Sequence, residues 1–371
     1  MRTPHRLRAL GSITIMAIRG QVEELPPMPG YVREEGMRHT CDRSVTVIFR
    51  YVVAAMLLGA AACTGAGTTA SPHPASTAVS DFREGQIIDT ATNENISLDQ
   101  LLAKLLDQEV IYLGEEHHNR FHVDAAVLLL QRLSAAGRRP TLAMEMFGWD
   151  GQTVIDRYLS STDATSQDFA GQVQWQQSWG GPFEDYEPLV RFAKEHRLRL
   201  IALNPPKTLV RTVARMGLTR ARQDPELSQW GMQDEVIVDD PVYRNRIVQQ
   251  LRACHDGGSD AMYQTMYEAS MVRDEGMAKI ITSEVRRIRT EDHSSSGPVV
   301  SYTGGGHVQL NLPVPKRVAR RLDNRIRQIS IYMTSFESER MDDVRGMIAE
   351  KIGDYVWLTR VGAQGPPRRC R

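Results

Sequence analysis

Two short segments of the sequence share the spacing Gly-x-x-His and could do chemistry. The first, GEEHH at 114–118, places two carboxylates and two imidazoles side by side after an apolar run. This combination suits metal ligation or a histidine–carboxylate acid–base pair, although a polar helix N-terminus would explain it without chemistry. The second, GGGH at 304–307, offers backbone N–H groups that no side chain obstructs. It suits a bound carboxylate, and a tight strand-to-helix turn is the alternative.

A buried carboxylate is expected at Glu145, which lies inside the apolar run LAMEMF. Such a run predicts the end of a buried strand, where an unpaired carboxylate is costly. We therefore expect Glu145 to be paired with a metal, a histidine or an arginine. A helix-capping carboxylate is the alternative.

Aromatic and methionine residues gather in two places. The segment 175–186 contains Trp175, Trp179, Phe183 and Tyr186. These rings could wall a flat hydrophobic ligand, or they could simply pack in the local core. Tyrosines and methionines also recur at three- and four-residue spacing over 262–277, which is typical of a core-facing helix. Asp274 and Glu275 interrupt this stripe, and we expect one of them to reach the site.

Beyond residue 81, short β-branched apolar runs alternate with longer amphipathic stretches, as they do in βαβ units. Strands are expected at 109–113, 141–145, 199–203, 298–303, 326–333 and 355–359, and helices at 122–133, 186–196, 206–216 and 259–289. We expect 224–240 to be irregular and 293–298 to form a loop. The predicted fold class is α/β, a mostly parallel sheet flanked by helices on both faces. Because polar segments follow successive strands, a ligand cleft is expected at the carboxyl-terminal edge of the strands.

The first eighty residues have the composition of an export signal. Residues 37–62 hold a basic stretch and then an apolar run that is too short to span a bilayer. The run ends before Cys63 and resembles a bacterial lipobox, although Ala60 stands where that box usually has leucine. We expect lipidation at Cys63; plain secretion with cleavage near Ala62 is the alternative. The expected organisation is an upstream extension outside the mature protein (1–36), a signal peptide (37–62), a flexible tether (63–80), one folded domain (81–362) and a disordered tail (363–371).

Charge and cysteine content exclude some classes of protein. The 45 basic and 45 acidic residues cancel, so no net charge draws the chain to nucleic acid. The four cysteines lie far apart and form no CxxC pair, which argues against a zinc site made of cysteines. We expect Cys254 to be structural and Cys370, in the basic tail, to be a free thiol.

Several motifs together resemble the ChaN-like haem-binding lipoproteins of the haem-uptake and Tiki superfamily. They are, in chain order, GEEHH, EMF, WGGPFEDYEPLVRFAKEH, ALNPP, ASMVRDEGMAKII and TGGGHVQLNLPVPKRV. The resemblance covers residues 83–335. It implies a lipid-anchored protein of the bacterial outer membrane, on its periplasmic or cell-surface face, that binds haem for iron uptake and is a carrier rather than an enzyme. It also implies a homodimer with two haems stacked face to face, and an outer-membrane haem receptor as a partner.

The resemblance extends to the residues of the haem site. In the family a tyrosine holds the iron, a ligand that suits ferric haem. Tyr186 and Tyr267 are the tyrosines that this sequence offers for that role. The full set of cofactor-binding residues expected from the resemblance is His117, His118, Glu145, Tyr186, Tyr267, Gly304, Gly305, Gly306 and His307.

A hydrolase is the alternative within the same superfamily. Its Tiki members resemble metal-dependent peptidases, and the related erythromycin esterases hydrolyse esters. Glu115, His117, Glu145 and His307 would suffice for one divalent metal such as zinc and an activated water. Both interpretations predict that His117, Glu145 and His307 share one cleft. A surface-anchored module for another apolar ligand is a third interpretation.

Overall fold

The computed structural model describes residues 82–255, 257–291 and 296–365. The expected extension, signal peptide, lipidation site and tether lie outside the described residues, as do Cys370 and most of the expected tail. Within the described ranges, no helix is both long and apolar enough to cross a membrane.

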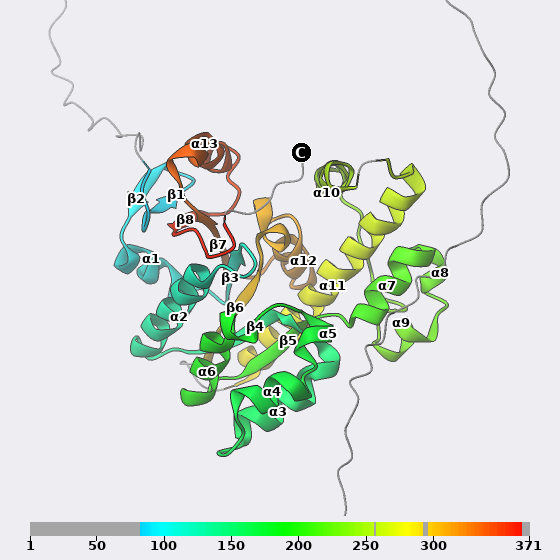
Figure 1. The fold of residues 1–371 in the computed structure, drawn as a ribbon, viewed down its shortest axis with the longest axis horizontal. Coiled ribbons are helices and arrows are strands. Elements are labelled where there is room, and N and C mark those ends of the chain that lie inside the picture. The colour runs from blue at the N-terminus through cyan, green and yellow to red at the C-terminus, as the bar shows by residue number, and fades with distance from the viewer. Residues whose placement is uncertain (1–81, 256, 292–295, 366–371) are drawn as a thin grey trace, which may run out of the picture. The chain divides into compact units, whose positions relative to one another are not determined.

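One eight-stranded sheet organises the described chain, in the order β2-β1-β8-β7-β3-β6-β4-β5 (Figure 1). The six strands from β8 to β5 run parallel to one another, whereas β1 is antiparallel to both of its neighbours. The strands are β1 Ile87–Asp89, β2 Glu94–Ile96, β3 Val110–Glu115, β4 Arg139–Gly148, β5 Leu200–Asn204, β6 Ser296–Gly304, β7 Gln328–Ser335 and β8 Tyr355–Thr359. The α/β fold with a mostly parallel sheet is therefore confirmed.

The central strands are buried on both faces, which explains why they read as continuous apolar runs. All six residues of β3 are buried, for example. Each of the six strands expected from the sequence is present. The hairpin of β1 and β2 was not expected, because three residues per strand are too few to show a pattern. The expected loop at 293–298 is wrong from Ser296 onward, where β6 begins.

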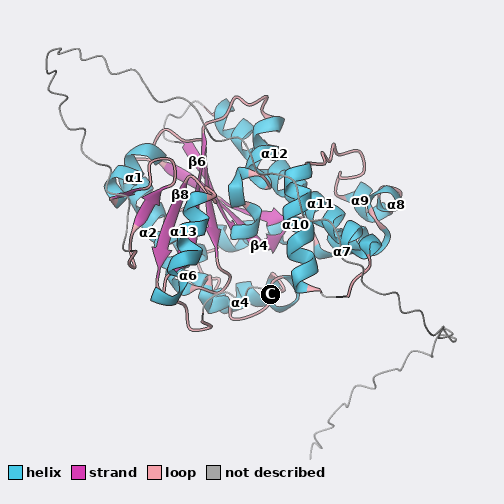
Figure 2. Cartoon of the chain, turned by 90° about the horizontal axis from the view of Figure 1, so that it is seen from above, coloured by secondary structure: helices cyan, strands magenta, loops and turns pink. Residues whose placement is uncertain are grey.

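Helices cover both faces of the sheet (Figure 2). On one face α2 and α6 pack in the larger apolar core, and on the other α11 and α12 pack in a second core. The helices are α1 Leu98–Leu105, α2 Arg120–Ala135, α3 Gln152–Ser160, α4 Ser166–Gln172, α5 Trp175–Ser178, α6 Glu187–Glu195, α7 Lys207–Met216, α8 Leu218–Ala221, α9 Pro225–Gln229, α10 Pro241–Cys254, α11 Asp260–Thr290, α12 Val314–Arg321 and α13 Met341–Ala349. The four helices expected from periodicity correspond to α2, α6, α7 and α11.

The long helix α11 carries the expected tyrosine and methionine stripe. Tyr263, Tyr267, Met271 and Met277 are all buried, so most of the stripe is core, as expected. Cys254, the last residue of α10, is disulfide-bonded, which agrees with a structural role.

Strand pairing brings the two Gly-x-x-His segments together. β3 and β6 are parallel neighbours, and Glu115 at the end of β3 is in register with Gly304 at the end of β6. β4, which carries Glu145, lies on the other side of β6. Because parallel strands end at one edge, the side chains after them converge there.

Candidate functional site

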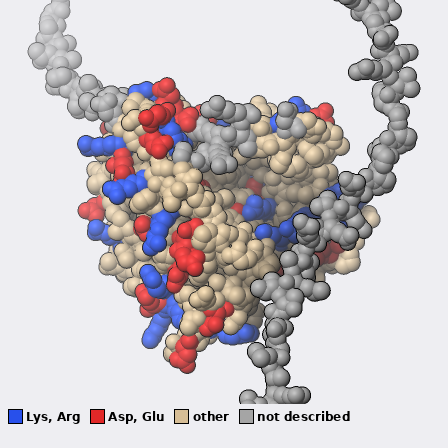
Figure 3. Space-filling model, in the orientation of Figure 1, with Lys and Arg blue, Asp and Glu red and all other residues tan. Residues whose placement is uncertain are grey.

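A cleft of about 760 Å³ opens at the carboxyl-terminal edge of the sheet. Its floor comes from the segments that follow β3 and β6, and its two walls come from α10 and α13. Figure 3 shows that the molecule is hollowed on this side and that Lys or Arg side chains lie in the hollow. The lining includes Glu115, Glu116, His117, Arg246, Gln249, Gln250, Ala253, Gly304, Gly305, Gly306, His307, Gln309, Tyr332, Arg340, Met347, Glu350 and Ile352.

Glu115 is the centre of a buried hydrogen-bond network beneath the cleft. Its carboxylate accepts from the hydroxyls of Tyr186 and Tyr302, each at 2.8 Å. His117 Nδ1 lies 2.8 Å from the same carboxylate. Burial raises the pKa of the Glu115 carboxyl, against the hydrogen bonds that lower it. These three hydrogen bonds hold the carboxylate, and with it His117, in one position.

His117 presents its other ring nitrogen to the cleft. With Nδ1 held by Glu115, Nε2 has no hydrogen-bond partner among the described residues. The side chain is 46% exposed, and the Trp179 ring meets it edge-on with centroids 4.8 Å apart. Burial lowers the pKa of His117, but the nearby carboxylates of Glu115 and Glu145 outweigh it and raise the pKa. A histidine held at Nδ1 by a carboxylate, with Nε2 open, has the arrangement common in metal-ligating histidines.

Glu145 is fully buried at the end of β4 and is saturated with partners. Its carboxylate accepts from Arg273 and, at 2.7 Å, from the backbone N–H of Gly304. His307 Nε2 lies 3.3 Å from it. Burial opposes ionisation, but His307 and Arg273 hold the pKa of Glu145 well below its ordinary value. The expectation of a paired carboxylate at this position is confirmed.

His307 is held at both ring nitrogens. Nδ1 lies 2.5 Å from Asp274, which also accepts from the hydroxyl of Tyr243 at 2.5 Å, and Nε2 faces Glu145. Burial lowers the pKa of His307, but the carboxylates of Glu145 and Asp274 outweigh it and raise the pKa to about 9. The imidazole is therefore charged at neutral pH, and neither nitrogen is open to a ligand.

The direct-metal arrangement is absent from the described residues. No group of three or more histidine, cysteine, aspartate or glutamate side chains there could hold a metal ion. The reason is that Arg273 occupies the carboxylate of Glu145, while carboxylates occupy both nitrogens of His307. The four residues expected for a zinc hydrolase do gather, but as ion pairs rather than as a ligand set.

Comparison with known proteins places this arrangement in a family. The family model described as "Haem-binding uptake, Tiki superfamily, ChaN" matches residues 101–318, more than half of the chain. The chain belongs to this family. Its structure is similar to that of ChaN of Campylobacter jejuni, described as "Cofacial heme binding", with a TM-score of 0.56 and 15% identity over 74% of this chain and 96% of that one.

Two other proteins are similar to the chain. A mutant of the erythromycin esterase EreC has a TM-score of 0.40 and 14% identity, over 69% of this chain and 77% of the esterase. Protein RETICULATA-RELATED 5, chloroplastic, of Arabidopsis thaliana is 21% identical over 72% of this chain. The chain spans 36% of the length of that curated relative.

The structure brings most of the residues expected in this ChaN-family site into one place. His117, Gly304, Gly305, Gly306 and His307 line the cleft, and Glu145 lies directly beneath it. Gly304 is tightly packed: a Cβ there would lie 2.6 Å from His117 Cε1 and 3.5 Å from Glu145 Oε2. His117 and His307 therefore line one cleft with Glu145 directly beneath it, so the three residues meet in one site.

His118 and the two expected tyrosines lie elsewhere. His118 has a left-handed backbone (φ 62°), and its Nδ1 lies 2.9 Å from Asp185, away from the cleft lining. The hydroxyl of Tyr186 is buried and donates to Glu115. Tyr267 is also buried and donates to Asp239 at 2.6 Å. As placed, neither phenol reaches the cleft, so iron ligation by Tyr186 or Tyr267 stays a prediction that requires each to leave its partner.

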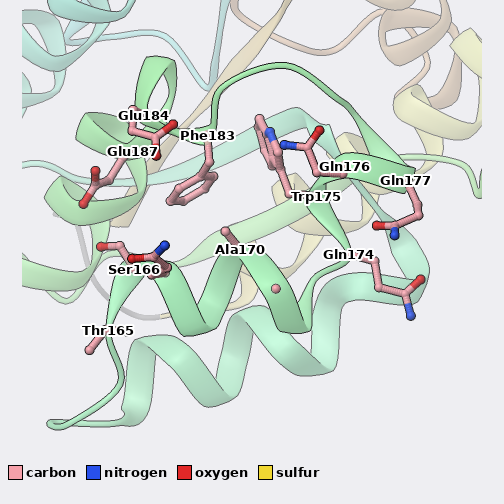
Figure 4. A pocket seen from close by; sticks show the side chains of 12 residues that line it. Thr165, Ser166, Ala170, Gln174, Trp175, Gln176, Gln177, Phe183, Glu184 and Glu187 are labelled. Carbon is pink, nitrogen blue, oxygen red and sulfur yellow. The ribbon is translucent and has the colours of Figure 1, made fainter. Parts of the chain in front are cut away.

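The aromatic segment 175–186 serves mainly as core. Trp175, Phe183 and Tyr186 are buried, and Trp179 is the ring of this segment that contacts the His117 ring. On its other side the segment lines a separate depression of about 640 Å³ (Figure 4). In Figure 4 the glutamines of α5 lie at one end of this depression, and Glu184 and Glu187 lie at the other. Trp175 and Phe183 line it, but no member of the cofactor-binding set expected from the resemblance does.

The sequence analysis did not predict some residues of the site and predicted others only in part. Asp274 reaches the site, as expected for one member of its pair, whereas Glu275 instead pairs with arginines of α12. Arg273, next to Asp274, was missed, although the charged run RDE inside an apolar helix was a usable signal. Tyr302 was missed because it alternates inside a buried strand like any core residue. Tyr332, which lines the cleft from β7, gave no sequence signal at all.

Proposed function

We propose that this chain binds haem in the cleft and that His117 Nε2 is the group that meets the iron. The observation that carries the proposal is the pairing of His117 Nδ1 with buried Glu115, which leaves Nε2 facing the cleft. A carboxylate on the far nitrogen fixes the ring and makes the near nitrogen a stronger donor. Imidazole is a common axial ligand of haem iron.

The rest of the cleft suits such a ligand. Its volume falls within the range of about 300–1,000 Å³ that small-molecule and cofactor sites occupy. Met347, Ile352 and the ring of Tyr332 supply apolar surface. Arg246 and Arg340, which pair with Glu350 and Glu116, supply the guanidinium groups that would turn to the carboxylates of a ligand. Haem is both a flat apolar ring and a dicarboxylate, so it matches this mixture.

The cellular role belongs to the same proposal. Haem binding would serve haem or iron uptake, on a protein anchored to the bacterial outer membrane through a lipid at Cys63 and delivering to or receiving from an outer-membrane receptor. Support comes from the sequence around Cys63 and from family membership. Mass spectrometry of the N-terminal peptide of the native protein would test it: a lipid-modified Cys63 at the N-terminus is expected, and an unmodified N-terminus near that position would contradict the anchor.

Haem binding is tested by titrating residues 64–371 with ferric haem. A saturable, shifted Soret band is expected for the wild type, and its loss or a large change in its position is expected for His117→Gln. His196→Gln is the matched control, because His196 is exposed at the end of α6 and remote from the cleft. A flat wild-type titration at micromolar haem would contradict haem binding.

Tyrosine ligation and dimerisation need separate measurements. If Tyr186 or Tyr267 leaves its partner to hold the iron, the matching phenylalanine variant loses the tyrosinate charge-transfer band and His117→Gln keeps it. With iron bound by His117, we expect no tyrosinate band in the wild type, and we expect Tyr186→Phe and Tyr267→Phe to keep the wild-type Soret band. We also propose that loaded chains pair face to face, because pairing removes two exposed haem faces from water. Sedimentation of the fully loaded protein as a monomer would contradict that pairing.

A further inference from the structure

Cys254, the last residue of α10, forms a disulfide bond at the rim of the cleft. The residue is exposed and belongs to the lining of the cleft. The sequence holds three other cysteines, Cys41, Cys63 and Cys370, and all three lie outside the described residues. The bond therefore joins one wall of the cleft to a part of the chain that is distant in sequence.

Export and lipidation would leave Cys370 as the partner. Cys41 falls in the expected signal peptide, which is removed on export. Cys63 is expected to carry a lipid on its sulfur, and a sulfur bonded to a lipid cannot also form a disulfide. Exported proteins reach oxidising compartments, where disulfides persist. The expectation of a free thiol at Cys370 would then be wrong.

The described chain ends on the side of the cleft opposite to α10. Beyond β8, Arg360 accepts a hydrogen bond at 3.1 Å from the side chain of Asn119, and Gly362 packs against the same residue. Asn119 caps α2, which covers one face of the sheet, whereas α10 packs on α11, which covers the other. A link from Gly362 to Cys254 therefore has to cross the carboxyl-terminal edge of the sheet, where the cleft opens.

The remaining chain has a suitable length for this crossing. Cys370 lies five residues beyond Gly365, the last described residue, and an extended chain of that length spans about 17 Å. A disulfide adds about 5.5 Å between the two Cα atoms that it joins. The opening is narrow, because Arg246 on α10 lies 3.1 Å from the carboxylate of Glu350, which follows α13 on the other wall.

The arginines in the described lining of the cleft are already engaged. Arg246 pairs with Glu350, and Arg340 pairs with Glu116. The charged imidazole of His307 lies between two carboxylates. A ligand that carries carboxylates would have to compete with these partners for each positive charge.

The segment 366–371, PPRRCR, can supply further positive charge. It contains three arginines and no acidic residue, and Arg369 and Arg371 flank Cys370 directly. A bond from Cys370 to the lining of the cleft would therefore bring both arginines to the opening. Guanidinium groups bind carboxylates through two parallel hydrogen bonds, which makes arginine well suited to hold such a ligand.

We propose that Cys254 is bonded to Cys370 and that this bond holds the segment 366–371 across the cleft, where Arg369 and Arg371 bind the carboxylates of the ligand. The disulfide of Cys254 is a feature of the structure, so the proposal assigns its partner and its function. The identity of the ligand as haem rests on the proposed function. The bond and the position of the segment do not, because neither requires a ligand.

Peptide mapping of the native protein, with free thiols alkylated first, tests the bond. Without reductant, the peptide that contains Cys254 should be recovered linked to the peptide that contains Cys370, and reduction should separate the two. Recovery of Cys254 linked to Cys41, to Cys63 or to Cys254 of a second copy would overturn the proposal, as would an alkylated Cys370.

Carbethoxylation of histidines with diethyl pyrocarbonate tests the position of the segment without ligand. His117 lies half exposed in the cleft, whereas His196 is exposed at the end of α6. In Cys370→Ser, His117 should react severalfold faster than in the wild type, because the segment no longer covers the opening, and His196 should react at the same rate in both proteins. Cys254→Ser breaks the same bond and should give the same result. An unchanged rate at His117 in these variants would overturn the position across the cleft.

Haem titration tests the two arginines while the disulfide stays intact. The double variant Arg369→Gln/Arg371→Gln should bind ferric haem about three- to tenfold more weakly than the wild type, the loss expected for two partly exposed ion pairs. Arg215→Gln, at an exposed arginine of α7, is the matched control and should bind as the wild type does. With the dimethyl ester of haem, whose carboxylates are blocked, the double variant and the wild type should bind alike.

Equal haem affinities in the double variant and the wild type would overturn carboxylate binding by these arginines. A difference that persists with the dimethyl ester would overturn it as well. If no protein binds haem, the proposed function fails, and peptide mapping and carbethoxylation still decide whether the segment is bonded across the cleft.

Discussion

The two Gly-x-x-His segments begin alike and end as opposite chemical groups. His117 follows β3, is half exposed and has one carboxylate partner, so its Nε2 remains open to the cleft. His307 follows the neighbouring strand β6, is largely buried and meets a carboxylate at each nitrogen. The spacing motif is the same and the two segments follow neighbouring parallel strands, one residue out of register, yet one histidine can bind a ligand and the other is a buried cation.

The difference comes from what each segment faces. Beneath His117 lie the hydroxyls of Tyr186 and Tyr302, which share Glu115 with it and are neutral. Beside His307 lies α11, which brings Asp274. A spacing motif therefore sets where a histidine stands, and neighbours from distant parts of the chain set what it can do.

The largest effect is expected from removing Glu145, one of the two carboxylates that pair with His307. Glu145→Ala leaves Arg273 and Nε2 of the charged His307 without the buried carboxylate that they share, so we expect the free energy of unfolding to fall by about 3–5 kcal/mol. Urea denaturation measures it. Glu195→Ala, which removes an exposed partner of Arg191, should change it by less than about 0.5 kcal/mol. Similar losses in the two variants would contradict the buried ion pair.

The raised pKa of His307 predicts how stability depends on pH. Its folded pKa of about 9 lies above the ordinary 6.5. Its contribution is therefore fully present below about pH 6.5 and is lost as pH rises through 9. We expect this histidine to account for a loss on the order of 3 kcal/mol across that window.

Asp274→Asn isolates that contribution, because it removes one of the two carboxylates that raise the pKa of His307. Denaturation curves at several pH values should show a smaller loss between pH 6.5 and 9 in this variant. Asp99→Asn, at an exposed carboxylate, should keep the wild-type dependence. If Asp274→Asn and the wild type lose the same stability over this window, His307 is not the group that titrates.

The sheet and the position of the cleft could be predicted from the sequence because both depend on local patterns. Apolar runs fix the six parallel strands, and polar residues directly after them mark the carboxyl-terminal edge. The pairing of Glu145 was also predictable, since a lone carboxylate in an apolar run needs a partner. These inferences require no knowledge of which distant segments meet.

The roles of individual site residues could not be predicted in the same way. Whether His117 or His307 is open depends on Asp274, which is 33 residues from His307 along the chain. The sequence also does not reveal that the hydroxyl of Tyr186 donates to the Glu115 carboxylate inside the core. The walls from α10 and α13 were missed because a mostly polar helix shows no core-facing stripe.

The contrast between the two histidines can also be tested at His117, by replacing its carboxylate partner with an amide of the same shape. Glu115→Gln removes the carboxylate behind Nδ1, so we expect haem affinity to fall about 10- to 100-fold, the usual effect of losing such a supporting group. Soret titration measures it. Asp185→Asn makes the same change behind His118, which does not line the cleft, and should leave the affinity unaltered. Equal haem affinities in Glu115→Gln and Asp185→Asn would contradict iron ligation by His117.

The smallest expected effect comes from one methyl group beside His117. In Gly304→Ala the added Cβ would lie 2.6 Å from His117 Cε1 and 2.9 Å from Nε2, whereas at Gly306 no neighbouring atom lies within 4 Å. The backbone of Gly304 (φ −57°) accepts alanine, so the methyl group must displace the ring. Because the ring is half exposed and can turn toward solvent, we expect a stability loss of only about 1 kcal/mol, at the low end for overpacking.

Haem affinity should differ between these two alanine variants. Both keep His117, so a difference would show that the position of its ring matters. Gly304→Ala keeps His117 and both of its neighbouring carboxylates but moves Nε2, so affinity should fall severalfold with little change in the urea midpoint. Gly306→Ala should change neither quantity, because its methyl group points into open space. Equal haem affinities for Gly304→Ala and Gly306→Ala would mean that haem does not depend on where Nε2 stands. The difference between the two histidines would then concern stability alone.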